Sequence, residues 1–151
     1  MEIPPIHISN IMKTCSQRLY LLMQLRYQGL SSQHLDTVFK SIIVMRAAYA
    51  ISAWCSFTNK EQQGQIDAFL KRSHRFGFTR RLFTFAQIAE RADRTLASST
   101  ANPNHCIHQL LPPARPEHIH FRGRVHPYTL PTCTFDLFKN SFINRCLFSF
   151  I

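Results

Sequence analysis

The densest group of side chains able to do chemistry is a basic cluster, Lys71–Arg81, with the sequence KRSHRFGFTRR. It holds five permanent cations and one histidine, and it contains no acidic residue. Guanidinium groups pair well with phosphate oxygens, and the rings of Phe76 and Phe78 could stack on exposed bases. The cluster therefore predicts a nucleic-acid backbone site with the candidate residues Lys71, Arg72, His74, Arg75, Phe78, Arg80 and Arg81. The alternative is a solvated basic face in which the two phenylalanines only anchor the loop.

A second group consists of histidines and cysteines, which are ligand types that zinc prefers. Its members are His105, Cys106, His108, His118, His120, His126 and Cys133. Their spacing matches no zinc finger or knuckle, because no C-x₂₋₄-C arm is present. We therefore predict no metal and no cofactor. A zinc-stabilised fold is kept as a minor alternative, with His105, Cys106, His118 and His120 as its best combination.

Catalysis finds little support in the sequence. There is no P-loop, no G-x-S-x-G, no G-x-G-x-x-G and no adjacent pair of aspartates. The eight acidic residues are dispersed, so a two-metal carboxylate site is not expected. Cysteine–histidine nucleophile chemistry lacks any motif that would orient the pair. The sequence therefore predicts a protein that is not an enzyme by itself.

The charge balance is strongly positive. Eighteen Lys and Arg against eight Asp and Glu give a formal net charge of +10. This excess favours an anionic partner, either nucleic acid or an anionic membrane surface, over a merely soluble basic protein. Five scattered cysteines without a C-x-x-C pair, and a start without an apolar signal region, favour an intracellular location in the cytoplasm or nucleus. The longest apolar stretch, Ser41–Phe57, is interrupted by Arg46 and predicts a buried helix without a membrane span.

Apolar spacing predicts a helical bundle in the first two-thirds of the chain. A first helix is expected over about Asn10–Gln28, with Gly29 as its stop. Ser31 or Ser32 would cap a second, largely apolar helix that continues without a break to Trp54. Thr58 and Glu61 form the expected capping box of a third helix, which Gly77 ends.

The third helix positions the basic cluster. Its apolar stripe, Ile66, Phe69, Leu70, Ser73 and Phe76, should point inward. Lys71, Arg72 and Arg75 fall on the opposite face and should point to solvent. A fourth helix is expected from Thr84, with Gln87 completing a second capping pattern, to about Leu96.

The character of the sequence changes at Ser98. Six prolines follow between Asn102 and Thr132, which excludes a long regular element. We therefore predict a helical unit over residues 1–97, an irregular Pro/His-rich strap over 98–133, and a Phe-rich amphipathic helix over 134–151. In that last helix Phe135, Phe138, Phe142 and Cys146 share one side, and the final FSFI needs an apolar groove to lie in.

The segment CSQRLYLLMQLRYQGLSSQHLDTVFKSIIVMRAAYAISAW, followed by IDAFLKRSHRFGF, resembles the region downstream of the palm in LINE-type (non-LTR) retrotransposon reverse transcriptases. The resemblance is carried by Gln17-Arg18-Leu19-Tyr20, by Gly29-Leu30, and by the close of the second helix on Tyr49-Ala50 and Trp54. The later segments NPNHCIHQLLPP and FDLFKNSFINRCLF resemble the C-terminal end of elements of the same family.

The resemblance implies a helical thumb and connector that contact the template–primer backbone, within a longer reading frame whose catalytic palm lies upstream. No residue of this chain matches the paired aspartates of that palm, so no catalytic role carries over. The expected partners are an RNA or DNA backbone and, through the C-terminal helix, the missing palm or another protein. The alternative is a helical structural or protein-interaction module that docks through its Phe-rich end and has no nucleic-acid role.

Overall fold

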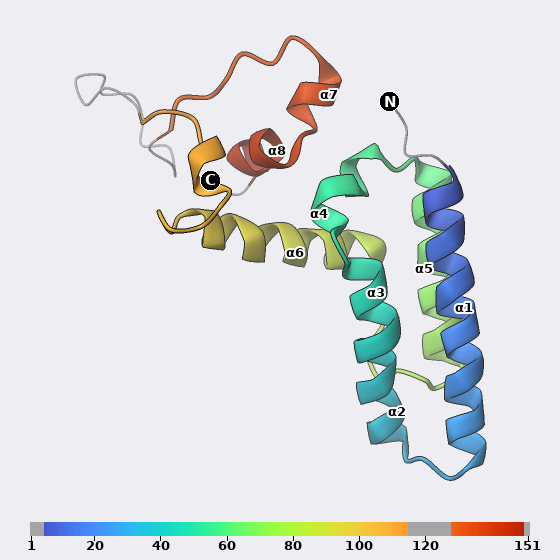
Figure 1. The fold of residues 1–151 in the computed structure, drawn as a ribbon. Helices are drawn as coiled ribbons and strands as arrows, with labels where there is room; N and C mark the ends of the chain where they lie inside the picture. The colour runs from blue at the N-terminus through green and yellow to red at the C-terminus, as the bar shows by residue number, and fades with distance from the viewer. Residues whose placement is uncertain (1–4, 115–127, 150–151) are drawn as a thin grey trace. The chain divides into compact units, whose positions relative to one another are not determined.

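A computed structural model describes residues 5–114 and 128–149 (Figure 1). These residues form a mainly α fold, as the apolar spacing predicts. The chain divides into two compact units, Met1–Ala89 and Glu90–Ile151. The boundary lies inside helix α6 (Phe85–Thr100), which runs beyond the expected end near Leu96 and beyond the expected domain limit at Ala97.

The first unit is built around α1 (Pro5–Tyr27), which contacts the helical segments between Ser32 and Ala48 and also α5 (Lys60–Arg75). α1 begins before Asn10, because a proline fits the first turn of a helix without losing a hydrogen bond. α1 and α5 run side by side in the same direction (Figure 1). Their apolar stripes form the core together with Leu35, Phe39, Ile43, Ile51, Trp54, Phe78 and Phe85.

The prediction of one unbroken second helix is wrong. The segment consists of α2 (Ser32–Phe39), a π-helical turn (Lys40–Val44), α3 (Met45–Ala48), α4 (Ile51–Trp54) and a 3-10 turn (Cys55–Phe57). Ala50 has a left-handed backbone with φ of 51°, which ends the helix. The buried indole of Trp54 donates to the carbonyl of Tyr49 at 3.1 Å, and this bond stabilises the break.

Helix beginnings are set by local side-chain caps. Ser31 caps α2, as predicted. The predicted capping box of Thr58 and Glu61 is wrong by one position, because Asn59 and Gln62 form it at α5. The hydroxyl of Thr58 instead donates to the carbonyl of Cys55 at 2.6 Å and accepts from the side-chain amide of Gln63 at 3.0 Å.

The second unit holds the rest of α6, a 3-10 turn (His108–Leu110), α7 (Asp136–Lys139) and α8 (Phe142–Ser149). The prediction of one continuous C-terminal helix is wrong, since the chain breaks at Asn140 and Ser141. Ser141 and Asn144 both donate to the carbonyl of Phe138, at 2.7 and 2.8 Å, in place of a helical N–H. The last two residues of FSFI, Phe150 and Ile151, lie outside the described residues.

One segment of the first unit, Ser32–Phe57, is long and apolar enough to cross a membrane by length and composition. This segment is longer than the apolar stretch Ser41–Phe57 of the sequence analysis, because it also includes Ser32–Lys40. Core helices of soluble proteins and signal sequences have the same property. In this fold Leu35, Phe39 and Ile43 of the segment are buried in the core of the first unit.

Candidate nucleic-acid interface

The basic cluster follows the chain around the end of α5. Gly77 adopts φ of 76°, and its N–H donates to the carbonyl of His74 at 2.9 Å. The N–H of Phe78 donates to the carbonyl of Ser73 at 3.2 Å. These two bonds form a Schellman motif, in which glycine supplies the left-handed residue. Gly77 thus ends α5, as predicted, and turns the second half of the cluster back toward the bundle.

The turn exchanges the predicted roles of the two phenylalanines. Phe78 is 1% exposed, so its ring belongs to the core and no face is free for a base. Its assignment as a binding residue is therefore corrected. Phe76, which was expected to point inward, is 50% exposed. The helical period no longer holds at Phe76, because its backbone, with ψ of 2°, is already leaving the helix.

A buried carboxylate on α2 anchors the loop that follows the turn. Oδ1 of Asp36 accepts hydrogen bonds from the hydroxyl of Thr79 at 2.8 Å and from the backbone N–H of Arg80 at 2.9 Å. Its Oδ2 pairs with Nζ of Lys40 at 2.6 Å. Burial by itself raises the pKa of Asp36, but the hydrogen bonds from Lys40, Arg80 and Thr79 outweigh burial, so the pKa lies below its usual value.

A second carboxylate fixes the far end of the loop. Oδ1 of Asp67 accepts the backbone N–H of Phe85 at 2.6 Å, where α6 begins. Thr84 caps the same helix by accepting the N–H of Gln87 at 3.3 Å, as predicted. Both acids therefore bind backbone or hydroxyl groups of the loop and leave its guanidinium groups to solvent.

The five permanent cations of the cluster are all exposed. The predicted outward face of α5 is confirmed for Lys71, Arg72 and Arg75, while His74 is half-buried. Within the described ranges, no carboxylate lies within ion-pair distance of Lys71, Arg72, Arg75, Arg80 or Arg81. Some of these groups lie over rings instead: Arg75 over Phe76 at 5.5 Å, and Arg81 over Phe83 at 5.9 Å.

Arg26, in the last turn of α1, adds a sixth cation that the sequence did not reveal. Its guanidinium donates to the carbonyl of Phe76 at 2.8 Å and lies 4.5 Å from the centre of the Phe78 ring. Arg26 is itself exposed. It therefore stabilises the turn and extends the positive surface from α5 to α1.

Known proteins do not identify this chain: no family model, no curated protein and no solved structure matches it. The interpretation of the basic cluster therefore rests on its geometry and charge.

The histidines and cysteines of the strap form no described cluster of metal ligands. His118, His120 and His126 lie outside the described residues, and no group of three candidate ligands occurs within 5–114 and 128–149. Of the others, Nδ1 of His105 accepts the N–H of Ile107 at 3.3 Å, and Nδ1 of His108 lies 2.8 Å from the carbonyl of Thr100. No disulfide joins any of the five cysteines.

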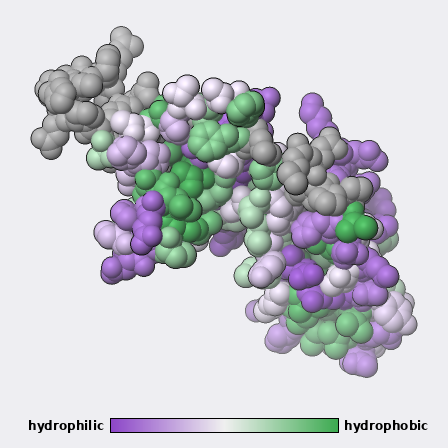
Figure 2. Space-filling model, turned by 45° about the horizontal axis from the view of Figure 1, so that its top comes forward, coloured by the Kyte–Doolittle hydropathy of each residue, from purple (hydrophilic) through white to green (hydrophobic). Residues whose placement is uncertain are grey.

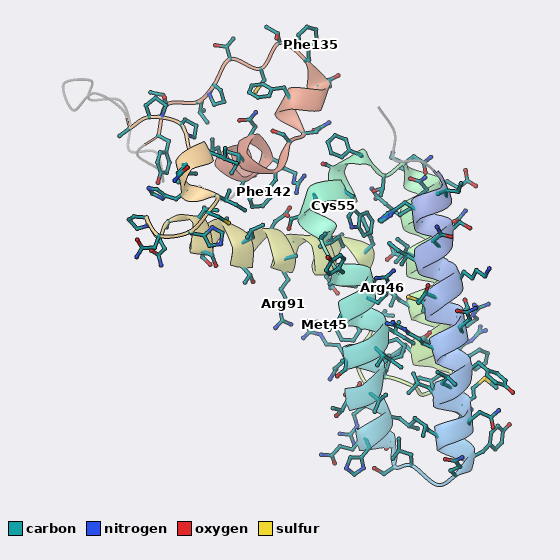
Figure 3. The ribbon with its side chains drawn as sticks, viewed as in Figure 1. Met45, Arg46, Cys55, Arg91, Phe135 and Phe142 are labelled. Atoms are coloured by element: carbon teal, nitrogen blue, oxygen red, sulfur yellow. The ribbon has the colours of Figure 1, made fainter. Side chains whose placement is uncertain are left out.

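Hydrophobic side chains also reach the surface in both units (Figure 2). In the second unit Phe135 is 74% exposed and Phe138 is 49% exposed, whereas Cys146 and Leu147 are buried. Figure 3 labels Phe135 just before α7 and Phe142 at the start of α8. The predicted Phe-rich side is therefore divided: Phe135 and Phe138 are exposed, whereas on α8 Phe142 is half-buried and Cys146 is buried.

Proposed function

We propose that the chain binds the phosphate backbone of RNA or DNA through the basic cluster and that it carries no catalytic site of its own. One observation carries the proposal: five exposed cations without a described carboxylate partner lie on the end of α5 and on the loop that follows it, and the backbone of that loop is held in place. The Schellman turn, Asp36 and Asp67 hold the backbone of this loop, so the cations need little further ordering when they bind. Guanidinium and ammonium groups suit the phosphates of a nucleic-acid backbone.

From the resemblance we further propose that this chain is the thumb-like part of a LINE-type RNA-directed DNA polymerase. Contact with the template–primer backbone is the role that such a thumb would have. An intracellular location, without a membrane span, belongs to the same proposal. The burial of Leu35, Phe39 and Ile43 in the core of the first unit supports it, since a span would present such side chains to lipid.

The test removes the five charges by changing Lys71, Arg72, Arg75, Arg80 and Arg81 to Gln. Binding to a fluorescent RNA and to an RNA–DNA primer–template is measured between about 50 and 200 mM salt. For the wild type, the logarithm of the binding constant should fall with the logarithm of salt by about 0.7–0.9 for each phosphate contact. The variant should bind weakly and with a much shallower slope.

A matched control removes five charges from other exposed positions, namely Lys13, Arg46, Lys60, Arg91 and Lys139. Both variants then carry the same net charge. A loss confined to the first variant supports a local site. An equal loss in both would mean that general positive charge drives the binding, and the proposed site would be wrong.

A second candidate function is a protein-interaction module, which the exposure of Phe135 and Phe138 favours. The partner would be the palm of a LINE-type polymerase. Changing both residues to Ser should then abolish binding to a purified palm and leave RNA binding intact. Phe135 and Phe138 are chosen because they are exposed. Changing the buried Cys146 and Leu147 to Ser would unfold the second unit, and a loss of binding would then say nothing about the surface.

A further inference from the structure

Phe76 is an aromatic residue that lies outside the core. It is 50% exposed, while the neighbouring aromatic residues Phe69 and Phe78 are 4% and 1% exposed. A half-exposed ring contributes little to folding, because much of its apolar area stays in water. Two cations contact it: Arg75 through the ring and Arg26 through the backbone carbonyl.

The backbone of Phe76 is fixed at both of its polar groups. Its N–H donates to the carbonyl of Arg72 at 3.0 Å, and its carbonyl accepts from Arg26 at 2.8 Å. Gly77 follows with the left-handed backbone that a Schellman turn requires. The backbone that carries the ring is thus fixed, and a ligand that packs on the ring does not have to order this part of the chain.

A cation lies over the ring. The guanidinium carbon of Arg75 is 5.5 Å from the centre of the Phe76 ring, within the range of a cation–π contact. The pair joins a planar apolar group to a planar charged group. Planar groups of this kind match a nucleotide, whose base stacks on the ring while its phosphate meets the guanidinium.

We infer that Phe76 is a stacking platform for an unpaired base, and that the basic cluster prefers single-stranded RNA or DNA, such as the unpaired part of a primer–template, over a duplex. This inference rests on the proposed function and adds the substrate class. A duplex offers its phosphates to the cations, but its bases are already stacked on one another and present no free face to Phe76. Single strands offer both groups at once.

The experiment measures binding of the full chain to a fluorescent single-stranded 12-mer and to the duplex of the same sequence. Phe76→Ala should weaken single-strand binding about tenfold, the effect of losing one stacked base, and leave duplex binding unchanged. Phe76→Trp should retain or improve single-strand binding. The salt dependence should stay the same in all variants, since the phosphate contacts remain.

Two controls separate stacking from apolar contact and from misfolding. Leu82 is an exposed apolar residue of the same loop at 44% exposure, and Leu82→Ala should change neither affinity. Thermal unfolding should show that Phe76→Ala folds like the wild type. If Phe76→Leu binds single strands as well as the wild type does, the ring face is not used and the inference is wrong.

The two proposals fail in different ways. If the wild type binds with the expected salt dependence but Phe76→Ala binds single strands unchanged, stacking is wrong and the phosphate site stands. An equal loss on single strands and duplex would also overturn stacking. If the wild type binds neither ligand, both proposals are wrong.

Discussion

The carboxylate of Asp36 accepts a hydrogen bond from the hydroxyl of Thr79 at 2.8 Å, across 43 positions of the chain. With the N–H of Arg80 on the same oxygen, it joins α2 to the loop that carries Arg80 and Arg81. Asp36 is 7% exposed, so these bonds are shielded from water. Asp36 thus holds in place the loop that carries two of the cations.

Changing Asp36 to Ala should destabilise the first unit by about 3 kcal/mol, because two donors lose their acceptor in a buried place. Urea unfolding followed by the fluorescence of Trp54, the single tryptophan, measures this change. Glu61→Ala, at an exposed acid of the same unit, should cost about 0.5 kcal/mol through the helix dipole. Equal losses in the two variants would contradict the anchoring role of Asp36.

The lowered pKa of Asp36 also predicts a dependence of stability on acid. The folded carboxyl has a lower pKa than the unfolded one, so its contribution is fully present above the unfolded value, near pH 4, and is lost as the pH falls through the folded value. The difference in unfolding free energy between the wild type and Asp36→Asn should therefore shrink below about pH 4. Urea unfolding at pH 7, 5, 4 and 3 gives this difference. A difference that is constant over the whole range would show that the carboxylate charge is not what stabilises the loop.

Two glycines of α5 and its turn should respond to alanine with opposite signs. Gly77 has φ of 76°, where a Cβ is strained, so Gly77→Ala should destabilise the first unit by about 1 kcal/mol. Gly64 lies on the exposed face of α5, and a Cβ there meets nothing within 4 Å. Gly64→Ala should therefore stabilise the unit by about 0.5–1 kcal/mol. Thermal unfolding of the two variants checks both signs, and a shared sign would refute the assigned Schellman turn.

Sequence reasoning succeeded where the signal is local. Gly29, Gly77 and Ser31 were predicted as helix limits because a cap depends on a few adjacent residues. It failed for Phe76 and Phe78, because the helical period was continued past the residue where the backbone leaves the helix.

Asp36 and Arg26 were missed for a different reason. Their partners in the basic cluster lie 43 and 50 positions away along the chain. A lone acid or arginine on a helix carries no sign of so distant a bond. Only the packing of α1, α2 and α5 brings these groups together, and that packing cannot be read from the spacing within one helix.

The last prediction concerns the second unit, where Asp93 of α6 binds Arg145 of α8. Nη2 of Arg145 lies 2.9 and 2.8 Å from the two carboxylate oxygens, and Nε lies 3.0 Å from Oδ2. The side chains are 6% and 18% exposed, so removing one partner leaves a charge in a largely buried place. Asp93→Ala should release α8 with a loss of about 3 kcal/mol, seen as faster amide hydrogen exchange over Phe142–Leu147. Glu90→Ala removes an acid of the same helix from an exposed pair with Arg94, and it should change the free energy of exchange by less than about 0.5 kcal/mol.

The double change of Asp93 to Leu and Arg145 to Met should recover much of the loss, because apolar groups of similar size can replace a buried ion pair. Unchanged exchange in Asp93→Ala would show that apolar contacts alone hold α8 in place.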